Sequence, residues 1–138
     1  TAKRFELPAV SHSRGAWREC LDTATELGIQ KAEFHWYSGP VDVLADIVKA
    51  GYYVSTSPSV AHSPQSREAM TFAPIERTLI ETDCPVFYRD QENPDQGFEA
   101  RPKDVIRTLK AYSELKNLDP EKALAILNKN AVEFFQLN

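Results

Sequence analysis

Cysteine, an excess of basic charge and long hydrophobic runs are all scarce or lacking in this sequence, and each shortage argues against a class of protein. The only cysteines are Cys20 and Cys84, so we expect no disulfide framework and a reducing compartment. No apolar run is long enough to cross a bilayer and no signal peptide opens the chain, so we expect a cytoplasmic protein without a membrane partner. The net charge of −4 gives the surface as a whole no preference for nucleic acid, although it leaves room for a local basic cleft.

The length and the first residues bear on how the chain is organised. A chain of 138 residues fits one domain, spanning 1–138, that can bury a core. Residues 2–7 have the pattern of the last turns of a helix, ended by Pro8, with nothing before them to begin that helix. The first residue is Thr1 rather than Met. We therefore interpret the sequence as a piece of a longer protein.

Short apolar runs alternate with helical patterns along the chain. The runs predict strands at 8–12, 31–35, 52–56 and 78–82. Strands that alternate with helices through right-handed crossovers form a parallel α/β sheet. A complete (β/α)₈ barrel needs about 250 residues. Four parallel β/α units therefore predict either an open sheet or half of a TIM-type barrel.

Capping residues and apolar spacing predict the helices. Ser13 is the expected N-cap of the first helix, and Pro40 is the expected first residue of the second. Residues 86–99 form a long polar loop, and Asn130 is expected to cap a separate last turn. The predicted helices run from about Ser13 to Gly28, Pro40 to Gly51, Gln65 to Phe72, Pro102 to Lys116 and Asp119 to Leu127.

Three side chains that can bind a metal stand at equivalent places in these units. His12, His35 and Asp83 each come at the end of a predicted strand. In parallel sheets, the carboxyl ends of the strands are where ligands and catalytic groups collect. Imidazole nitrogen and carboxylate oxygen suit Zn²⁺ and similar ions. A metal site is one interpretation, and ordinary hydrogen-bonded polar residues at strand ends are the other.

The segments around these residues resemble a known family. LPAVSHSR, FHWYSG and LIETDCP, in this order, are similar to the signature segments of the TatD family of metal-dependent deoxyribonucleases. NKNAVEFF near the end is similar to the closing helix of that family. The resemblance covers essentially the whole chain. It implies the C-terminal half of a (β/α)₈ barrel within the amidohydrolase-like group.

The same resemblance implies a chemistry. His12 and His35 would be metal ligands on the fifth and sixth barrel strands. Asp83 would end the eighth strand, bind metal and act as general base toward the attacking water. The cofactor would be a divalent ion, Zn, Mg or Mn, with two ions in the intact site. The intact protein would cleave phosphodiester bonds in DNA by metal-activated water.

The sequence lacks some of the metal ligands that belong to the family pattern. The family's first pair, a His-x-His on the first strand, is absent, as is the Glu on the fourth strand that bridges the metals. His62 stands alone in a loop and does not replace that pair. Only the last three ligands are present. We therefore predict little or no nuclease activity from this chain alone.

Five further residues are candidates for supporting roles. Arg14 could grip a phosphate or lie at a helix start on the surface. Ser38 and Gly39 could bind a phosphate at a helix N-terminus or form a simple cap. His62 could contact substrate or be an ordinary loop histidine. Glu81 shares a strand face with the carboxylate two residues later, and could support a metal ligand or be a paired core carboxylate.

Two alternative functions stay open. Related barrels with a similar ligand set hydrolyse amides or esters. A half-barrel could also be a non-catalytic unit that pairs with a copy of itself, because four parallel strands leave two edges and an interior face uncovered. The expected partners are therefore DNA or another phosphodiester substrate, a second copy of the chain, or a missing N-terminal half.

Overall fold

A four-stranded parallel sheet forms the centre of the computed structural model, which describes residues 1–89 and 97–137. The strands lie in chain order, β1-β2-β3-β4, so each crossover moves in the same direction. This order confirms the parallel α/β prediction and is the order of a barrel wall. A doubly wound sheet reverses direction at a switch point. The strands are β1 (Ala9–Ser11), β2 (Ala32–Phe34), β3 (Tyr53–Thr56) and β4 (Thr78–Ile80).

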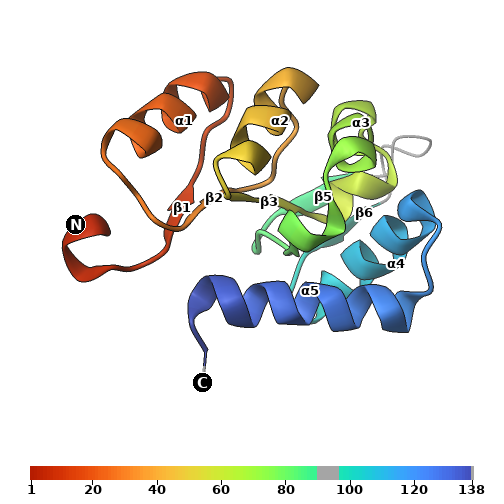
Figure 1. The fold of residues 1–138 in the computed structure, drawn as a ribbon. Helices are drawn as coiled ribbons and strands as arrows, with labels where there is room; N and C mark the ends of the chain where they lie inside the picture. The colour runs from red at the N-terminus through yellow and green to blue at the C-terminus, as the bar shows by residue number, and fades with distance from the viewer. Residues whose placement is uncertain (90–96, 138) are drawn as a thin grey trace.

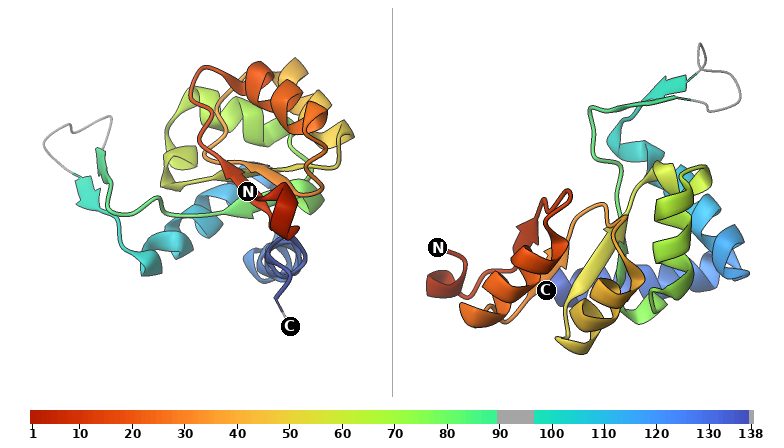
Figure 2. Two further views of the ribbon diagram at one scale, coloured as in Figure 1. Left: turned by 90° about the vertical axis from the view of Figure 1, so that its left-hand side faces the viewer. Right: turned by 90° about the horizontal axis from the view of Figure 1, so that it is seen from above.

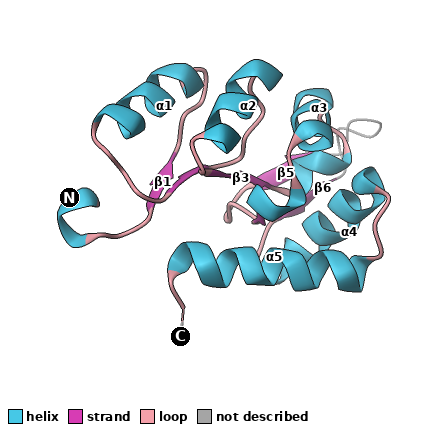
Figure 3. Ribbon diagram, viewed as in Figure 1, coloured by secondary structure: helices cyan, strands magenta, loops and turns pink. Residues whose placement is uncertain are grey.

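Helices occupy both sides of this sheet (Figure 1). Helices α1 to α3 line up along one side, and α5 runs along the other. Helices make up far more of the described residues than strands do, and the strands are short, as Figure 3 shows. Among the described residues, no helix has the length and hydrophobicity to cross a membrane. The helices are α1 (Trp17–Glu26), α2 (Val41–Lys49), α3 (Pro64–Phe72), α4 (Val105–Lys116) and α5 (Pro120–Phe135).

The two faces of the sheet have different partners because side chains alternate along each strand. Phe34 and Val54 belong to the main core, which the helices also build. Tyr53 and Leu79 belong to a smaller cluster with Phe134 of α5. Phe134 is completely buried, and its ring centroid lies 5.4 Å from that of Tyr53.

Helix α5 lies across the amino ends of the strands. Asn130 donates to the carbonyl oxygens of Ile75 and Thr78, where β4 begins. Lys31, just before β2, donates to the carbonyl oxygen of Glu133. These contacts close one end of the sheet and leave the carboxyl ends of the strands for the candidate site.

Two predicted features of the last third of the chain are wrong. Asn130 does not cap a separate turn, because α5 is continuous over 16 residues and the buried Asn130 amide bonds to carbonyl groups outside its own helix. Part of the predicted loop 86–99 is an antiparallel hairpin of β5 (Phe87–Arg89) and β6 (Gly97–Glu99). Both views of Figure 2 show this hairpin projecting away from the sheet. Residues 90–96 of the predicted loop lie outside the described residues.

Three element boundaries predicted near the start of the chain also differ from those in the structure. Helix α1 begins at Trp17 rather than after Ser13, because residues 13–16 make a turn in which Ala16 N donates to Ser13 O. Pro40 is the N-cap of α2 rather than its first residue. Residues 2–7 contain only a short 3₁₀ turn, η1 (Lys3–Phe5). The other 3₁₀ turns are η2 (Pro58–Ala61), η3 (Ile75–Arg77) and η4 (Pro102–Asp104).

Candidate metal centre

His35 is the central residue at the carboxyl ends of the strands. It follows β2, and its backbone N–H donates to Ser11 O of β1 at 3.0 Å. Its Nδ1 lies 2.5 Å from Oε2 of Glu81, and its Nε2 lies 3.4 Å from Oδ1 of Asp83. The ring of His12 lies beside it, with centroids 5.5 Å apart. The structure thus brings three strand ends together around one imidazole.

Glu81 is held in place by a short series of hydrogen bonds. Its Oε1 accepts from Ser55 Oγ at 2.9 Å, and Ser55 Oγ accepts from the backbone N–H of Trp36 at 3.0 Å. Burial raises the pKa of Glu81, while His35 and Ser55 oppose that rise. An ionised Glu81 accepts a hydrogen from Nδ1 of His35, which leaves the lone pair of Nε2 for a cation.

The backbone turns sharply at two places around His35. Trp36 has φ +48° and Asp83 has φ +50°, both in the left-handed region. Aspartate tolerates this conformation better than most residues do. At Asp83 the turn ends the extended chain after β4 while the carboxylate still faces His35. The ligand candidates therefore lie where each strand gives way to its loop.

The spacing of His35 and Asp83 fits two ligands of one divalent ion. Two ligand atoms that each lie about 2.1 Å from a tetrahedral zinc ion are about 3.4 Å apart. The contact between Nε2 of His35 and Oδ1 of Asp83 measures 3.4 Å. Two imidazoles on one such ion have centroids about 5 Å apart, near the 5.5 Å that separates His12 from His35. His12 is exposed, and the structure does not bring its ligand atoms within 4.8 Å of those of both His35 and Asp83.

A second, more compact group also contains His35. Among the described residues, Glu33, His35 and Glu81 bring ligand atoms within 4.8 Å of one another. Burial raises the pKa of Glu33 to about 7, opposed by Ser55 and His35 and reinforced by Glu81. A metal held through Nδ1 would displace the hydrogen between Nδ1 and Glu81, because Nδ1 cannot hold both. The outer set, His12, His35 and Asp83, keeps that hydrogen bond.

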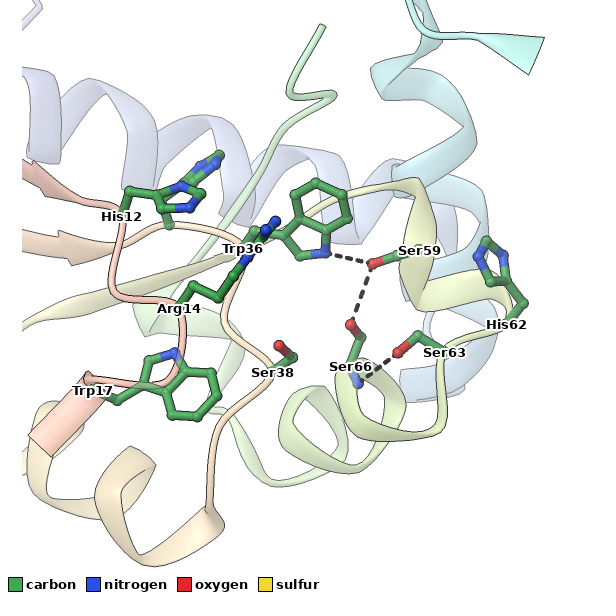
Figure 4. A pocket seen from close by; sticks show the side chains of 10 residues that line it. His12, Arg14, Trp17, Trp36, Ser38, Ser59, His62, Ser63 and Ser66 are labelled. Carbon is green, nitrogen blue, oxygen red and sulfur yellow. Dashed lines mark hydrogen bonds between the residues drawn. The ribbon is translucent and has the colours of Figure 1, made fainter. Parts of the chain in front are cut away.

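A cavity of about 340 Å³ opens beside His35 (Figure 4). Arg14, Ser38 and His62, three of the predicted substrate contacts, line it. Gly39 is not among the lining residues, and a Cβ at this position would lie 2.6 Å from the ring of Trp17. This close approach explains the glycine without a ligand. Whether Arg14, Ser38, Gly39 or His62 contacts substrate stays a prediction.

Sequence reasoning missed Glu33 and Ser55, although both lie at the centre. Glu33 is only 4% exposed, and its place between Ala32 and Phe34 in an apolar strand was a usable signal. Ser55 lies two residues after Tyr53 on the same strand face. Its contact with Glu81 comes from the pairing of β3 with β4, where Ser55 is opposite Leu79, and a serine alone does not reveal it.

Comparison with known proteins places this arrangement in a family. The sequence model described as TatD related DNase matches residues 1–136. The chain belongs to this family. The four parallel strands, in sequential order, are about half of a TIM-type barrel, as solved members of the TatD family also indicate. The structure of the TatD homologue YJJV from Escherichia coli k12 matches with a TM-score of 0.87 at 22% identity, over 99% of this chain and 53% of that one.

Curated relatives of this TatD-family chain carry names that point to metal-dependent hydrolysis. Deoxyribonuclease TATDN3 of Homo sapiens is 28% identical over 97% of this chain and 47% of its own length. The uncharacterized metal-dependent hydrolase TatD of Mycobacterium tuberculosis is 32% identical over 94% of this chain and 49% of its own. The chain therefore spans about half the length of these relatives, and their names support the hydrolase class.

Proposed function

We propose that this chain supplies the carboxyl-terminal ligands of a metal-dependent hydrolase centre that cleaves phosphodiester bonds in DNA. The observation that carries the proposal is the position of His35, with one nitrogen on Glu81 and the other facing Asp83. His12, His35 and Asp83 would hold the ion, which is Zn, Mn or Mg, with a second ion in the intact site. A bound ion would acidify water and polarise a phosphoryl oxygen.

Each residue has a separate task in this proposal. Glu81 fixes the ring and tautomer of His35, as carboxylates beside metal-binding histidines commonly do. Asp83 presents Oδ1 toward His35, and its second oxygen, Oδ2, accepts the proton of the attacking water. Arg14, which lines the cavity beside His35, binds a phosphate oxygen of the substrate.

The decisive experiment separates metal binding from turnover. The chain is titrated with Zn²⁺, Mn²⁺ and Mg²⁺ by calorimetry, and each loaded sample is incubated with single-stranded DNA. We expect binding that Asp83→Ala weakens by at least the roughly 10–100-fold typical of losing a group that only supports a ligand, and no robust turnover. Asp22→Ala, an exposed carboxylate on α1, is the control and leaves metal affinity unchanged.

One result would contradict this assignment, and another would contradict the expected inactivity of the chain alone. Equal metal affinity in the wild type and in Asp83→Ala would remove Asp83 from the site. Robust DNA cleavage that disappears in Asp83→Ala would support the site but overturn the expectation that this chain alone is inactive.

Self-association is a second candidate role, favoured by the exposure of β1. Val10 on this edge strand is 56% exposed, although it is opposite the buried Glu33. A second copy of the chain, with its own β4 edge, could cover this region. Sedimentation velocity over a range of concentrations tests this proposal. A monomer at the highest concentration would exclude it.

A further inference from the structure

The carbonyl groups just before Asp83 lie beyond the paired part of the sheet. The pairing of β3 with β4 ends at Thr56 and Ile80, and the backbone N–H of Glu81 adds one hydrogen bond to Thr56 O at 3.0 Å. A buried carbonyl group that has left a sheet needs another donor, because an unpaired one costs free energy. The carbonyl oxygens of Glu81 and Thr82 therefore depend on donors outside the strands.

Two hydroxyl groups from different elements supply these donors. Thr108 of α4, which is completely buried, donates to Glu81 O at 2.8 Å. Tyr88 of β5, which is 5% exposed, donates to Thr82 O at 2.8 Å. This second carbonyl belongs to the peptide group that joins Thr82 to Asp83. Because a peptide group is planar, the hydrogen bond from Tyr88 restrains the backbone orientation of Asp83.

The conformation that these donors restrain also directs a ligand. Asp83 has φ +50°, and left-handed residues other than glycine persist where their surroundings hold them. In this conformation Oδ1 of Asp83 lies 3.4 Å from Nε2 of His35. Loss of a donor would allow the carboxylate to leave its place beside the imidazole.

Tyr88 also contacts the turn that follows His35. Trp36, the next residue, is left-handed as well, with φ +48°. Its ring centroid lies 5.6 Å from that of Tyr88, and its indole N–H donates to Ser59 Oγ at 2.8 Å. One side chain thus restrains both left-handed turns of the candidate metal centre.

The hairpin and the start of α4 hold Tyr88 in turn. Phe98 of β6 stacks on it, with ring centroids 5.5 Å apart and planes inclined by 22°. Arg107 lies over Phe98 at 4.3 Å, and its Nε donates to Asp104 at 3.0 Å. Tyr88, Phe98 and Arg107 border a second cavity, of about 380 Å³. Because these three side chains contact one another, the stack serves the protein itself by fixing the position of Tyr88.

We propose that the hydroxyl groups of Tyr88 and Thr108 position Asp83 for metal binding. Tyr88 also contacts Trp36, and so helps to keep His35 facing that carboxylate. Both are positioning residues that act through the backbone of the ligand. This inference rests on the proposed function for the ion that the ligands bind. It gives the β5–β6 hairpin a task in building the site, which none of the proposed catalytic steps assigns.

Calorimetric titration with Zn²⁺ tests the role of Tyr88. Tyr88→Phe removes only the hydroxyl group and should weaken Zn²⁺ binding by roughly tenfold or more, the loss typical of a group that supports a ligand. Tyr52→Phe is the matched control, because Tyr52 is also 5% exposed and donates at 2.8 Å to Ile29 O, ahead of β2. Its Zn²⁺ affinity should equal that of the wild type. Each variant loses one buried hydrogen bond, so urea denaturation should show similar losses of stability.

A second pair of variants tests Thr108 and does not depend on the folding of Tyr88→Phe. Thr108→Val should weaken Zn²⁺ binding several-fold. Thr78→Val is its control and should leave the affinity unchanged, because Thr78 is also completely buried and donates at 2.9 Å to Pro74 O, before β4.

Amide hydrogen exchange, measured by NMR in EDTA, tests the same positioning without metal. The amides of Glu81 and Trp36 are both hydrogen-bonded, so their exchange reports opening of the two turns. Both should exchange several-fold faster in Tyr88→Phe than in Tyr52→Phe.

Equal Zn²⁺ affinities in Tyr88→Phe and Tyr52→Phe would overturn the inference for Tyr88, and equal affinities in the second pair would overturn it for Thr108. A wild type that binds no Zn²⁺ would refute the proposed function, and hydrogen exchange would then decide the inference. Faster exchange in Tyr88→Phe would support the positioning of the two turns, and equal exchange would overturn it as well.

Discussion

The two ends of the same four strands differ in almost every physical respect. At the amino ends, α5 closes the sheet with a fully buried Phe134 and with the side-chain amide of Asn130. At the carboxyl ends lie imidazoles, carboxylates, two cavities and the left-handed residues Trp36 and Asp83. One end stabilises the fold by burial, and the other keeps polar groups where a ligand can reach them. This separation predicts that stability and metal affinity can be changed independently.

The largest effect, on the free energy of unfolding, should come from the amino ends of the strands, which α5 covers. Phe134→Ala removes a completely buried ring, and such truncations cost about 3–5 kcal/mol in free energy of unfolding. Urea denaturation measures this loss. Phe135→Ala, next to it on α5 and 46% exposed, should cost less than half as much. If the folded fraction of Phe134→Ala also lost metal affinity, the two ends would not be independent.

A smaller effect, on metal affinity rather than on stability, is expected at the carboxyl ends of the strands. Glu81→Gln keeps the shape of the side chain but removes the carboxylate that holds Nδ1 of His35. Loss of such a supporting group typically weakens metal binding by about 10–100-fold. Stability without metal should not fall, because burial disfavours the charged form of Glu81, as its raised pKa indicates. Calorimetric titration and urea denaturation of the same sample measure both quantities.

The smallest effect on metal affinity should come from Ser55, whose hydroxyl donates to Glu81. Ser55→Ala removes one hydrogen bond to Glu81 and one from the Trp36 backbone, so metal affinity should fall by about tenfold or less. Ser59→Ala is the control, because Ser59 accepts from the indole of Trp36 and not from its backbone. Equal losses in the two variants would show that the effect comes from Trp36 rather than from Glu81.

Local patterns were enough to predict the strands and the residues that end them. His12, His35 and Asp83 each follow a short apolar run, and parallel strands must bring their carboxyl ends to one edge. The spacing within the site could not be predicted in this way. Ser55 reaches Glu81 only because β3 pairs with β4, 26 residues away along the chain.

The missed features near the end of the chain have a similar cause. Asparagine is common at helix caps, which is why Asn130 was predicted to be one. Its side-chain amide instead donates to the carbonyl oxygens of Ile75 and Thr78, more than fifty positions earlier. Tertiary hydrogen bonds decided its role there. The hairpin of β5 and β6 was hidden by a polar sequence that is typical of loops, and the stacking of Tyr88 on Phe98 forms only once the two strands are paired.

The contacts of α5 also bear on the order in which the molecule folds. The four strands pair only with neighbours in the sequence, so the sheet can assemble while the rest of the chain is still unfolded. Helix α5 joins residues from opposite ends of the chain, because Glu133 accepts from Lys31 and Gln136 donates to Glu6 across 102 and 130 positions. During synthesis, these contacts must wait until the last turn of α5 has left the ribosome. Until then Tyr53 and Leu79 lack the cover that Phe134 gives them, so the sheet exposes apolar side chains that favour aggregation.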